Sequence, residues 1–232
     1  MKMMVITCGV WPSEDVARRK MWIFMRSCEK FGVDPVLYGG GTPSFPGYRA
    51  MKLDMQLEFL KGVKGYTHVM YTDGWDAFFV AHMDEVVEKY EGMGRPPMLV
   101  AAFNQLSNVS DADKDYPGCF DERVMYRYPH VGGYIGEVGY VIEMFERMNR
   151  LTNDDCFSWY DGWKEGWFRP ELDHGCQVFQ VTDEHLVMKD GRVFNTEMGS
   201  FPCVLHLSGG YTDPGTGKDD RMLPWAKRAG VL

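Results

Sequence analysis

Two aspartates, Asp73 and Asp76, lie three residues apart and directly follow an apolar run that is typical of a buried strand. Two carboxylates across a tight turn can face one point, where they repel each other unless a cation lies between them. Carboxylate and water ligands suit Mg²⁺ or Mn²⁺ rather than a soft metal, and such a cation can stabilise a departing diphosphate. Turns also collect Asp and Gly for conformational reasons, so a plain capped turn stays open.

The elements around this segment alternate between strands and helices. Strands are expected at 3–8, 35–38, 67–72 and 98–103, and helices at 14–31, 48–61 and 83–91. This alternation predicts an α/β fold, a Rossmann-like mixed, mostly parallel sheet flanked by helices. In such sheets ligands bind beyond the carboxyl ends of the strands, where Asp73 and Asp76 are expected.

The second half of the chain is less regular. Residues 104–129 are polar and rich in Gly and Pro, which predicts a long loop that could carry function. The run 131–136 leads into a helix at 137–150, and late strands are expected at 177–181 and 203–207. No repeat or low-complexity linker marks a boundary, so we expect one domain over residues 1–232.

Composition excludes some classes of protein. The net charge is −8, which argues against a general nucleic-acid coat, although a local basic patch is compatible with it. The sequence contains no apolar run of about 18 residues, so no membrane span is expected. Residues 1–9 are typical of a strand rather than a signal peptide. The six cysteines form no Cys-x-x-Cys pair, so we expect reduced thiols in a cytoplasmic protein, or in host cytoplasm for a viral one. A zinc site at His174 and Cys176 is disfavoured for the same reason.

Four separated motifs resemble a known family. They are VMYTDGWDAFFV (69–80), VGGYIG (131–136), LDHGCQVFQ (172–180) and PCVLHLSGG (202–210). The same motifs occur in this order in the glycosyltransferase domain of procollagen lysyl hydroxylases and in related single-domain proteins of microbes and viruses. The resemblance covers roughly residues 1–212 and implies a GT-A fold, a UDP-sugar donor and Mn²⁺ (or Mg²⁺) as cofactor. The resemblance does not extend to the oxygenase domains of those proteins, so hydroxylation is not implied.

The resemblance assigns metal binding to three residues. Asp73 and Asp76 match the acidic metal-binding motif of the family, and His206 matches its late histidine ligand. Without the resemblance, a lone histidine on an apolar strand such as His206 would be interpreted as a hydrogen-bonded core residue. Imidazole beside carboxylates is acceptable to Mn²⁺.

Five residues are expected on the donor side. Trp75 matches an aromatic beside the uracil, although it could simply pack under the turn. Lys52 matches a lysine near the diphosphate, although a helix lysine is usually solvated. Gly132 and Gly133 would let the backbone approach the donor, or form a plain strand entry. Thr72 ends the strand that enters the metal turn.

Three residues are expected on the acceptor side. Asp154 and Asp155 match an acidic cluster that faces the sugar and the acceptor, and they could equally cap the next helix. His174 could act near the acceptor or serve as a structural hydrogen-bonding residue. The aromatic stretch at 159–168 could stack an acceptor or pack on the core.

The chain departs from the family pattern at several places. His130 and Val131 stand where the family has Asn-Ser, Cys156 replaces a Gln, and Leu207 replaces the glycine after the late histidine. These changes affect the choice of sugar and acceptor more than the metal site.

The sequence therefore predicts a metal-dependent glycosyltransferase that moves a hexose, expected to be glucose, from a UDP-sugar to an acceptor hydroxyl. The acceptor stays open among a protein hydroxylysine, a glycan, a small molecule and a hydroxymethylated DNA base. Two other readings are a catalytically silent UDP-sugar-binding module and a UDP-sugar hydrolase.

Overall fold

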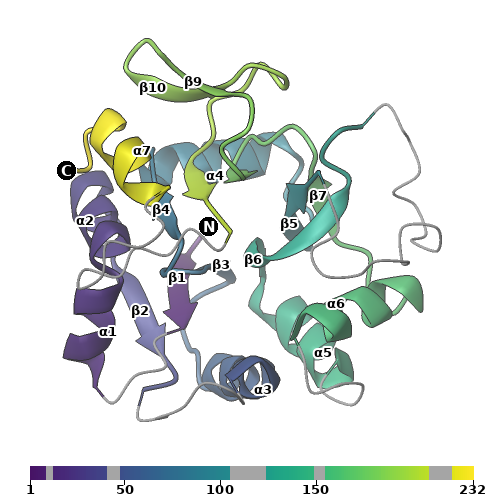
Figure 1. Cartoon of the computed structure of the whole chain (residues 1–232). Helices are drawn as coiled ribbons and strands as arrows, with labels where there is room; N and C mark the ends of the chain where they lie inside the picture. The colour runs from purple at the N-terminus through teal and green to yellow at the C-terminus, as the bar shows by residue number, and fades with distance from the viewer. Residues whose placement is uncertain (9–12, 41–47, 105–123, 149–154, 209–220) are drawn as a thin grey trace.

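A computed structural model describes residues 1–8, 13–40, 48–104, 124–148, 155–208 and 221–232, with the backbone alone at 48–51, 155–158 and 160. Its centre is a six-stranded sheet with the order β2-β1-β3-β6-β5-β7 (Figure 1). The strands are β2 (Pro35–Tyr38), β1 (Met3–Cys8), β3 (His68–Thr72), β6 (Tyr128–Glu137), β5 (Met98–Phe103) and β7 (Glu171–Asp173).

The pairing is mostly parallel, as the sequence predicts. β1 runs parallel to β2 and β3, and β5 runs parallel to β7. The exception is β6, which is antiparallel to both of its neighbours, β3 and β5. The α/β fold with a mixed, mostly parallel sheet is confirmed.

A second, three-stranded sheet carries the late strands. Its order is β4 (Ala77–Phe79), β11 (Val204–His206) and β8 (Phe179–Val181). β11 is antiparallel to β4 and parallel to β8, and its register sets His206 opposite Ala77. Ala77 directly follows Asp76, so this register brings the late histidine beside the acidic turn.

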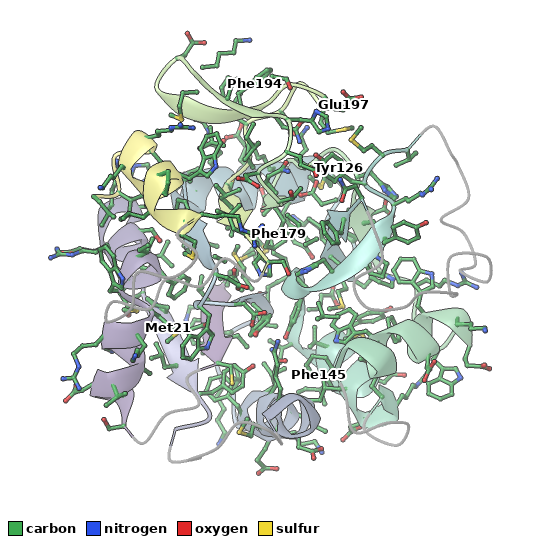
Figure 2. The ribbon with its side chains drawn as sticks, viewed as in Figure 1. Met21, Tyr126, Phe145, Phe179, Phe194 and Glu197 are labelled. Atoms are coloured by element: carbon green, nitrogen blue, oxygen red, sulfur yellow. The ribbon has the colours of Figure 1, made fainter. Side chains whose placement is uncertain are left out.

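Helices cover both faces of the central sheet (Figure 1). One group consists of α3 (Tyr48–Lys61), α5 (Val138–Met148) and α6 (Asp155–Lys164), and the other of α1 (Glu14–Lys20), α2 (Trp22–Phe31), α4 (Met83–Gly92) and α7 (Met222–Arg228). Successive residues of a strand face opposite sides, so Ile6 joins the core beside α3 and α5 while Val5 joins the core beside α2. Figure 2 shows Phe145 among α5 and α6, and Met21 beside α1 and α2.

Three local features differ from the sequence prediction. The helix expected at 14–31 breaks at Met21, whose ψ of 33° leaves the helical range, although the apolar pattern continues through the break. A hairpin of β9 (Leu186–Lys189) and β10 (Arg192–Asn195) was missed. Its Asp190-Gly191 turn has positive φ at both residues, which is a strong hairpin signal. The helix α7 was also missed in the polar tail.

The helices and the cysteines bear on two expectations from the composition. Among the described residues, none of the helices combines the length and the apolar character needed to cross a lipid bilayer. The four cysteines with described side chains, Cys8, Cys28, Cys176 and Cys203, are buried and take part in no disulfide among the described residues.

Asp173, at the end of β7, is a buried carboxylate with a structural task. Its two oxygens accept the backbone N–H groups of Gln177 at 2.8 Å, Val178 at 2.7 Å and Phe179 at 2.8 Å. Burial raises the pKa of this carboxyl, and the three N–H donors act in the opposite direction. The side chain thereby holds the chain at the entry to β8.

We expect Asp173→Asn to lower the free energy of unfolding by about 1–3 kcal/mol, because an amide NH₂ group cannot accept the buried N–H donors that face it. Urea denaturation of the purified protein measures this change. The exposed Asp34 supplies the matched control, since Asp34→Asn removes the same charge from the surface. Equal stability of the two variants would contradict the assignment.

Candidate metal centre

Asp73, Asp76 and His206 come together at one point. Each offers a ligand atom, and these atoms all lie within 4.8 Å of one another. Nε2 of His206 lies 2.9 Å from Oδ1 of Asp76. The three residues come from different places in the fold: the residue after β3, the residue before β4, and the end of β11. Two carboxylates and one imidazole are a donor set that fits a divalent cation such as Mn²⁺.

Asp73 is held by two donors from the α3 side of the sheet. Nζ of Lys52 lies 3.2 Å from its Oδ1, and the hydroxyl of Tyr71 donates to the same oxygen. The ammonium of Lys52 also lies 5.1 Å from the centre of the Tyr71 ring. Lys52 is buried rather than solvated, so its charge belongs to the site.

His206 is buried between Asp76 and a second histidine. Burial alone would lower the pKa of its imidazole, but the charge and hydrogen bond of Asp76, with a further contribution from Asp73, raise that pKa above its ordinary value. Within the part of the chain that the structure describes, its Nδ1 is buried without a hydrogen-bond partner. Nε2 is the ring nitrogen that faces the Asp76 carboxylate.

His130 stacks edge-on against His206, with ring centroids 4.6 Å apart and planes at 81°. Burial, followed by the neighbouring His206, holds the pKa of His130 well below its ordinary range, so this ring is neutral near pH 7. Its Nδ1 lies 3.2 Å from the backbone N–H of Gly132 and accepts from it. The proton of the neutral ring is therefore on Nε2.

Gly132 makes room for the His206 ring. A Cβ at this position would lie 2.0 Å from Cε1 and 2.6 Å from Nδ1 of His206, and at Gly133 it would lie 2.8 Å from Cδ1 of Phe179. The carbonyl of Gly132 accepts the N–H of Asp73 at 3.0 Å. In the structure both glycines admit neighbouring side chains of the protein itself, and their expected closeness to the donor stays a prediction.

A bulge in β6 explains how Gly132 reaches both ligands. In the pairing of β5 with β6, Val100 lies opposite Tyr134 and Ala101 lies opposite His130, so the segment 131–133 has no partner on β5. The extra residues bend the strand locally, a device found next to active sites. They bring the Gly132 backbone against the His206 ring and into hydrogen-bonding contact with the backbone of Asp73.

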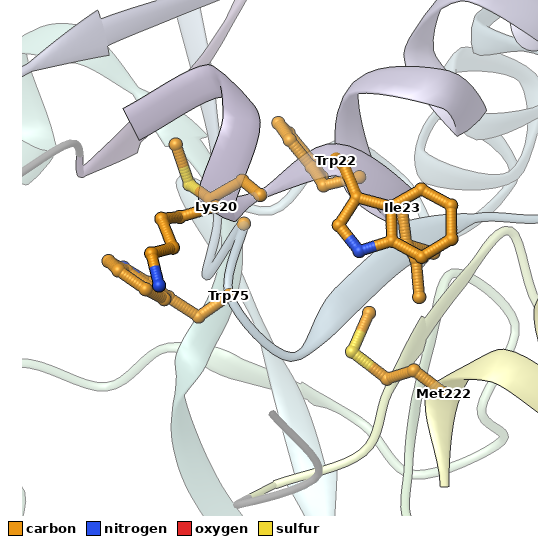
Figure 3. A pocket seen from close by; sticks show the side chains of 8 residues that line it. Lys20, Trp22, Ile23, Trp75 and Met222 are labelled. Carbon is orange, nitrogen blue, oxygen red and sulfur yellow. The ribbon is translucent and has the colours of Figure 1, made fainter. Parts of the chain in front are cut away.

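Trp75, expected beside a uracil, lies half-buried at the outer side of the turn. With Lys20, Trp22 and Met222 it lines a shallow surface depression between α1, α2 and α7. Figure 3 shows the Lys20 side chain extending toward the Trp75 indole, with Trp22 and Met222 on the far side. This depression encloses no space that would hold a water molecule, so it is not a formed ligand pocket.

The remaining expected residues lie apart from the cluster or outside the description. Nδ1 of His174 lies 2.6 Å from the carbonyl oxygen of Tyr126, and because a carbonyl only accepts, this nitrogen carries a hydrogen. Thr72 is buried, and its hydroxyl has no hydrogen-bond partner among the described residues. Asp154 lies outside the described residues, and Asp155 begins α6 with its side chain undescribed.

Sequence reasoning missed two residues of this site. Tyr71 reads as a strand residue, yet its hydroxyl reaches Asp73. Thr7 stands in the apolar run MMVITC, and its hydroxyl accepts the N–H of Gly74 at 2.9 Å. A lone hydroxyl in an otherwise apolar strand was the available signal for Thr7. His130 was noted only as a departure from the family pattern.

The sequence matches a known protein family. The family model described as the PLOD GT domain matches residues 2–212. The chain belongs to this glycosyltransferase family. Procollagen-lysine,2-oxoglutarate 5-dioxygenase 2 of Mus musculus is 29% identical over 61% of this chain and 20% of its own length. The Homo sapiens protein of the same name is 25% identical over 90% of this chain and 30% of its own length. The chain thus spans under a third of these relatives.

A solved structure shares the fold. It is a glycosyltransferase involved in the glycosylation of the major capsid of PBCV-1, with a TM-score of 0.50 and 11% identity. The match covers 100% of both chains. At this identity the likeness concerns the fold alone.

We expect Gly132→Ala to weaken Mn²⁺ binding by about 10–100-fold, because the added methyl would displace the His206 ring. Overpacking should also lower stability by about 1–3 kcal/mol. Isothermal titration with Mn²⁺ and thermal unfolding measure the two effects.

Gly139 is the matched control for this substitution, because it lies exposed on α5 with nothing within 4 Å of an added Cβ. Gly139→Ala should leave Mn²⁺ binding unchanged and favour the helix slightly. Unchanged Mn²⁺ affinity in Gly132→Ala would show that the imidazole is not a ligand.

Proposed function

We propose that this glycosyltransferase is Mn²⁺-dependent and moves a hexose, glucose in the first instance, from a UDP-sugar to an acceptor hydroxyl. The observation that carries the proposal is the convergence of Asp73, Asp76 and His206 within 4.8 Å. The family membership supports the transferase class. The choice of UDP as the nucleotide and glucose as the hexose is what the family resemblance implies.

The donor side of the reaction follows from the residues around the cluster. Asp73, Asp76 and His206 would hold the cation, which supplies positive charge to the diphosphate as UDP departs. Lys52 adds a second positive charge, buried and 3.2 Å from Asp73. A buried charge acts in a lower dielectric than water and is stronger for that reason. Trp75 offers an aromatic face beside the turn for the base.

The acceptor side rests on the family resemblance. Asp154 or Asp155 would orient the acceptor hydroxyl toward the anomeric carbon, or support the positive charge that develops on the sugar ring. If the configuration at the anomeric carbon is retained, as in the glucosyl step of the family, the departing phosphate can take the acceptor proton. No strong base is then required of this chain.

The first test is UDP release from a panel of UDP-sugars, with Mn²⁺ or with chelator and without an added acceptor. We expect slow, metal-dependent release from one sugar, with free sugar as the second product, because water can replace a missing acceptor. Metal-dependent UDP binding without release would favour strict acceptor dependence or a silent binding module. Absence of UDP binding would refute the proposal.

Asp76→Ala should reduce metal-dependent UDP release by about 100-fold or more, because loss of a cation ligand removes several kcal/mol of charge stabilisation from the transition state. Steady-state UDP release measures the loss, and circular dichroism checks the fold. Asp34→Asn, a change at an exposed carboxylate away from the cluster, should keep the wild-type rate. Near wild-type turnover of Asp76→Ala would exclude Asp76 as a ligand.

A further inference from the structure

The separation of Asp73 from Asp76 depends on the turn between them. Its two ends are fixed by backbone hydrogen bonds: Asp73 donates to the carbonyl of Gly132 at 3.0 Å, and Leu207 donates to the carbonyl of Asp76 at 2.7 Å. These bonds come from β6 and from the residue after β11. Neither fixes the peptide that follows Asp73, whose orientation decides where the Asp73 carboxylate lies relative to that of Asp76.

Thr7 of β1 fixes that peptide. Its Oγ1 accepts the N–H of Gly74 at 2.9 Å, across 67 residues of sequence. Thr7 is fully buried and Gly74 is buried too, so no water can take over this bond. Thr7 faces the α2 side of the sheet, like Val5 two residues before it.

Met21 and Phe24 pack against Gly74 and hold the turn in contact with Thr7. A Cβ at Gly74 would lie 2.9 Å from Oγ1 of Thr7, 2.7 Å from Sδ of Met21 and 3.1 Å from Cδ1 of Phe24. The Gly74 backbone therefore fills a narrow space between β1 and α2. A small change in the Thr7 side chain must move the turn, because the neighbours on the other side are packed against it.

We propose that Thr7 is a positioning residue for the cation: its hydroxyl orients the Asp73-Gly74 peptide and so sets the gap between the two carboxylates. Thr7 itself touches neither cation nor donor. This inference rests on the metal site of the proposed function. Groups that orient metal ligands from behind affect cation affinity by about 10–100-fold.

Thr7→Val tests the inference, because valine has nearly the same shape and puts a methyl where the acceptor oxygen was. We expect the Kd for Mn²⁺ to rise about tenfold, measured from the EPR signal of free Mn²⁺ with and without saturating UDP. Thr7→Ser keeps the oxygen and should restore the Kd to within about threefold of wild type. If Thr7→Val does not fold, Thr7→Ala loses the same acceptor without the added methyl and carries the same expectation.

Ser27 provides the control for a purely structural effect. Its buried hydroxyl accepts the N–H of Phe79 at 3.0 Å, a comparable bond at the far end of β4, three residues after Asp76. Ser27→Ala should lower the melting temperature and leave the Kd for Mn²⁺ unchanged. Mn²⁺ affinity that falls equally in Ser27→Ala and Thr7→Val would reduce Thr7 to a general packing residue and overturn the inference.

The wild-type protein separates this inference from the proposed function. If it binds Mn²⁺ and releases UDP while Thr7→Val binds Mn²⁺ equally well, the role of Thr7 is refuted and the function stands. If the wild-type protein binds no Mn²⁺ in the presence of UDP, both are overturned.

Discussion

The proximity of two carboxylates is the constraint on which the site depends. Two negative charges no more than 4.8 Å apart repel each other by at least about 3 kcal/mol at an effective dielectric constant of 20. The fold offsets this repulsion with groups of its own: the Lys52 ammonium and the donating Tyr71 hydroxyl at Asp73, and the His206 ring at Asp76. The ligand set can therefore fold before any cation arrives. A cation would then compete with the positive groups already beside each carboxylate.

The geometry of this cluster comes from strands that meet end to end. β3 delivers Asp73, the small sheet brings His206 opposite Ala77, and β6 passes beside both. Because β6 is antiparallel to β3, its register sets Gly133 opposite Thr72, one residue before the metal turn. Gly132 and Gly133 thus lie where the backbone of β6 comes closest to the turn that follows β3. Chemistry at the turn depends on pairings made by residues far apart in the sequence.

Much of this arrangement could be predicted from the sequence, for identifiable reasons. The parallel strands β1, β2 and β3 carry local apolar runs, and Asp73 and Asp76 are close in sequence, so local patterns predict both. His206 lies more than a hundred residues away, and only the family resemblance connected it to them. Apolar periodicity gave no sign that the helix breaks at Met21, whose side chain lies against Gly74, a residue distant in sequence.

Some residues were assigned a place that the three-dimensional packing changes. Lys52 has the spacing of a surface lysine, yet α3 turns it inward onto Asp73. The glycines of 131–136 suggested an approach to a ligand, whereas the space at Gly132 is taken by His206. A glycine in a strand pattern predicts close approach without naming the partner. The partner becomes known only when the second sheet is placed.

The bulge in β6 also explains why the departure at His130 is compatible with the cluster of Asp73, Asp76 and His206. The bulge takes the segment 131–133 out of its pairing with β5, so the buried N–H of Gly132 needs another acceptor. Nδ1 of the neutral His130 ring supplies it at 3.2 Å. The asparagine that the family has here carries a side-chain oxygen, which can accept the same hydrogen bond. A buried donor without an acceptor is costly, so this position is constrained to residues that can accept. His130 meets that constraint and adds a ring against His206, so the substitution preserves the backbone path that brings Gly132 to the histidine and to Asp73.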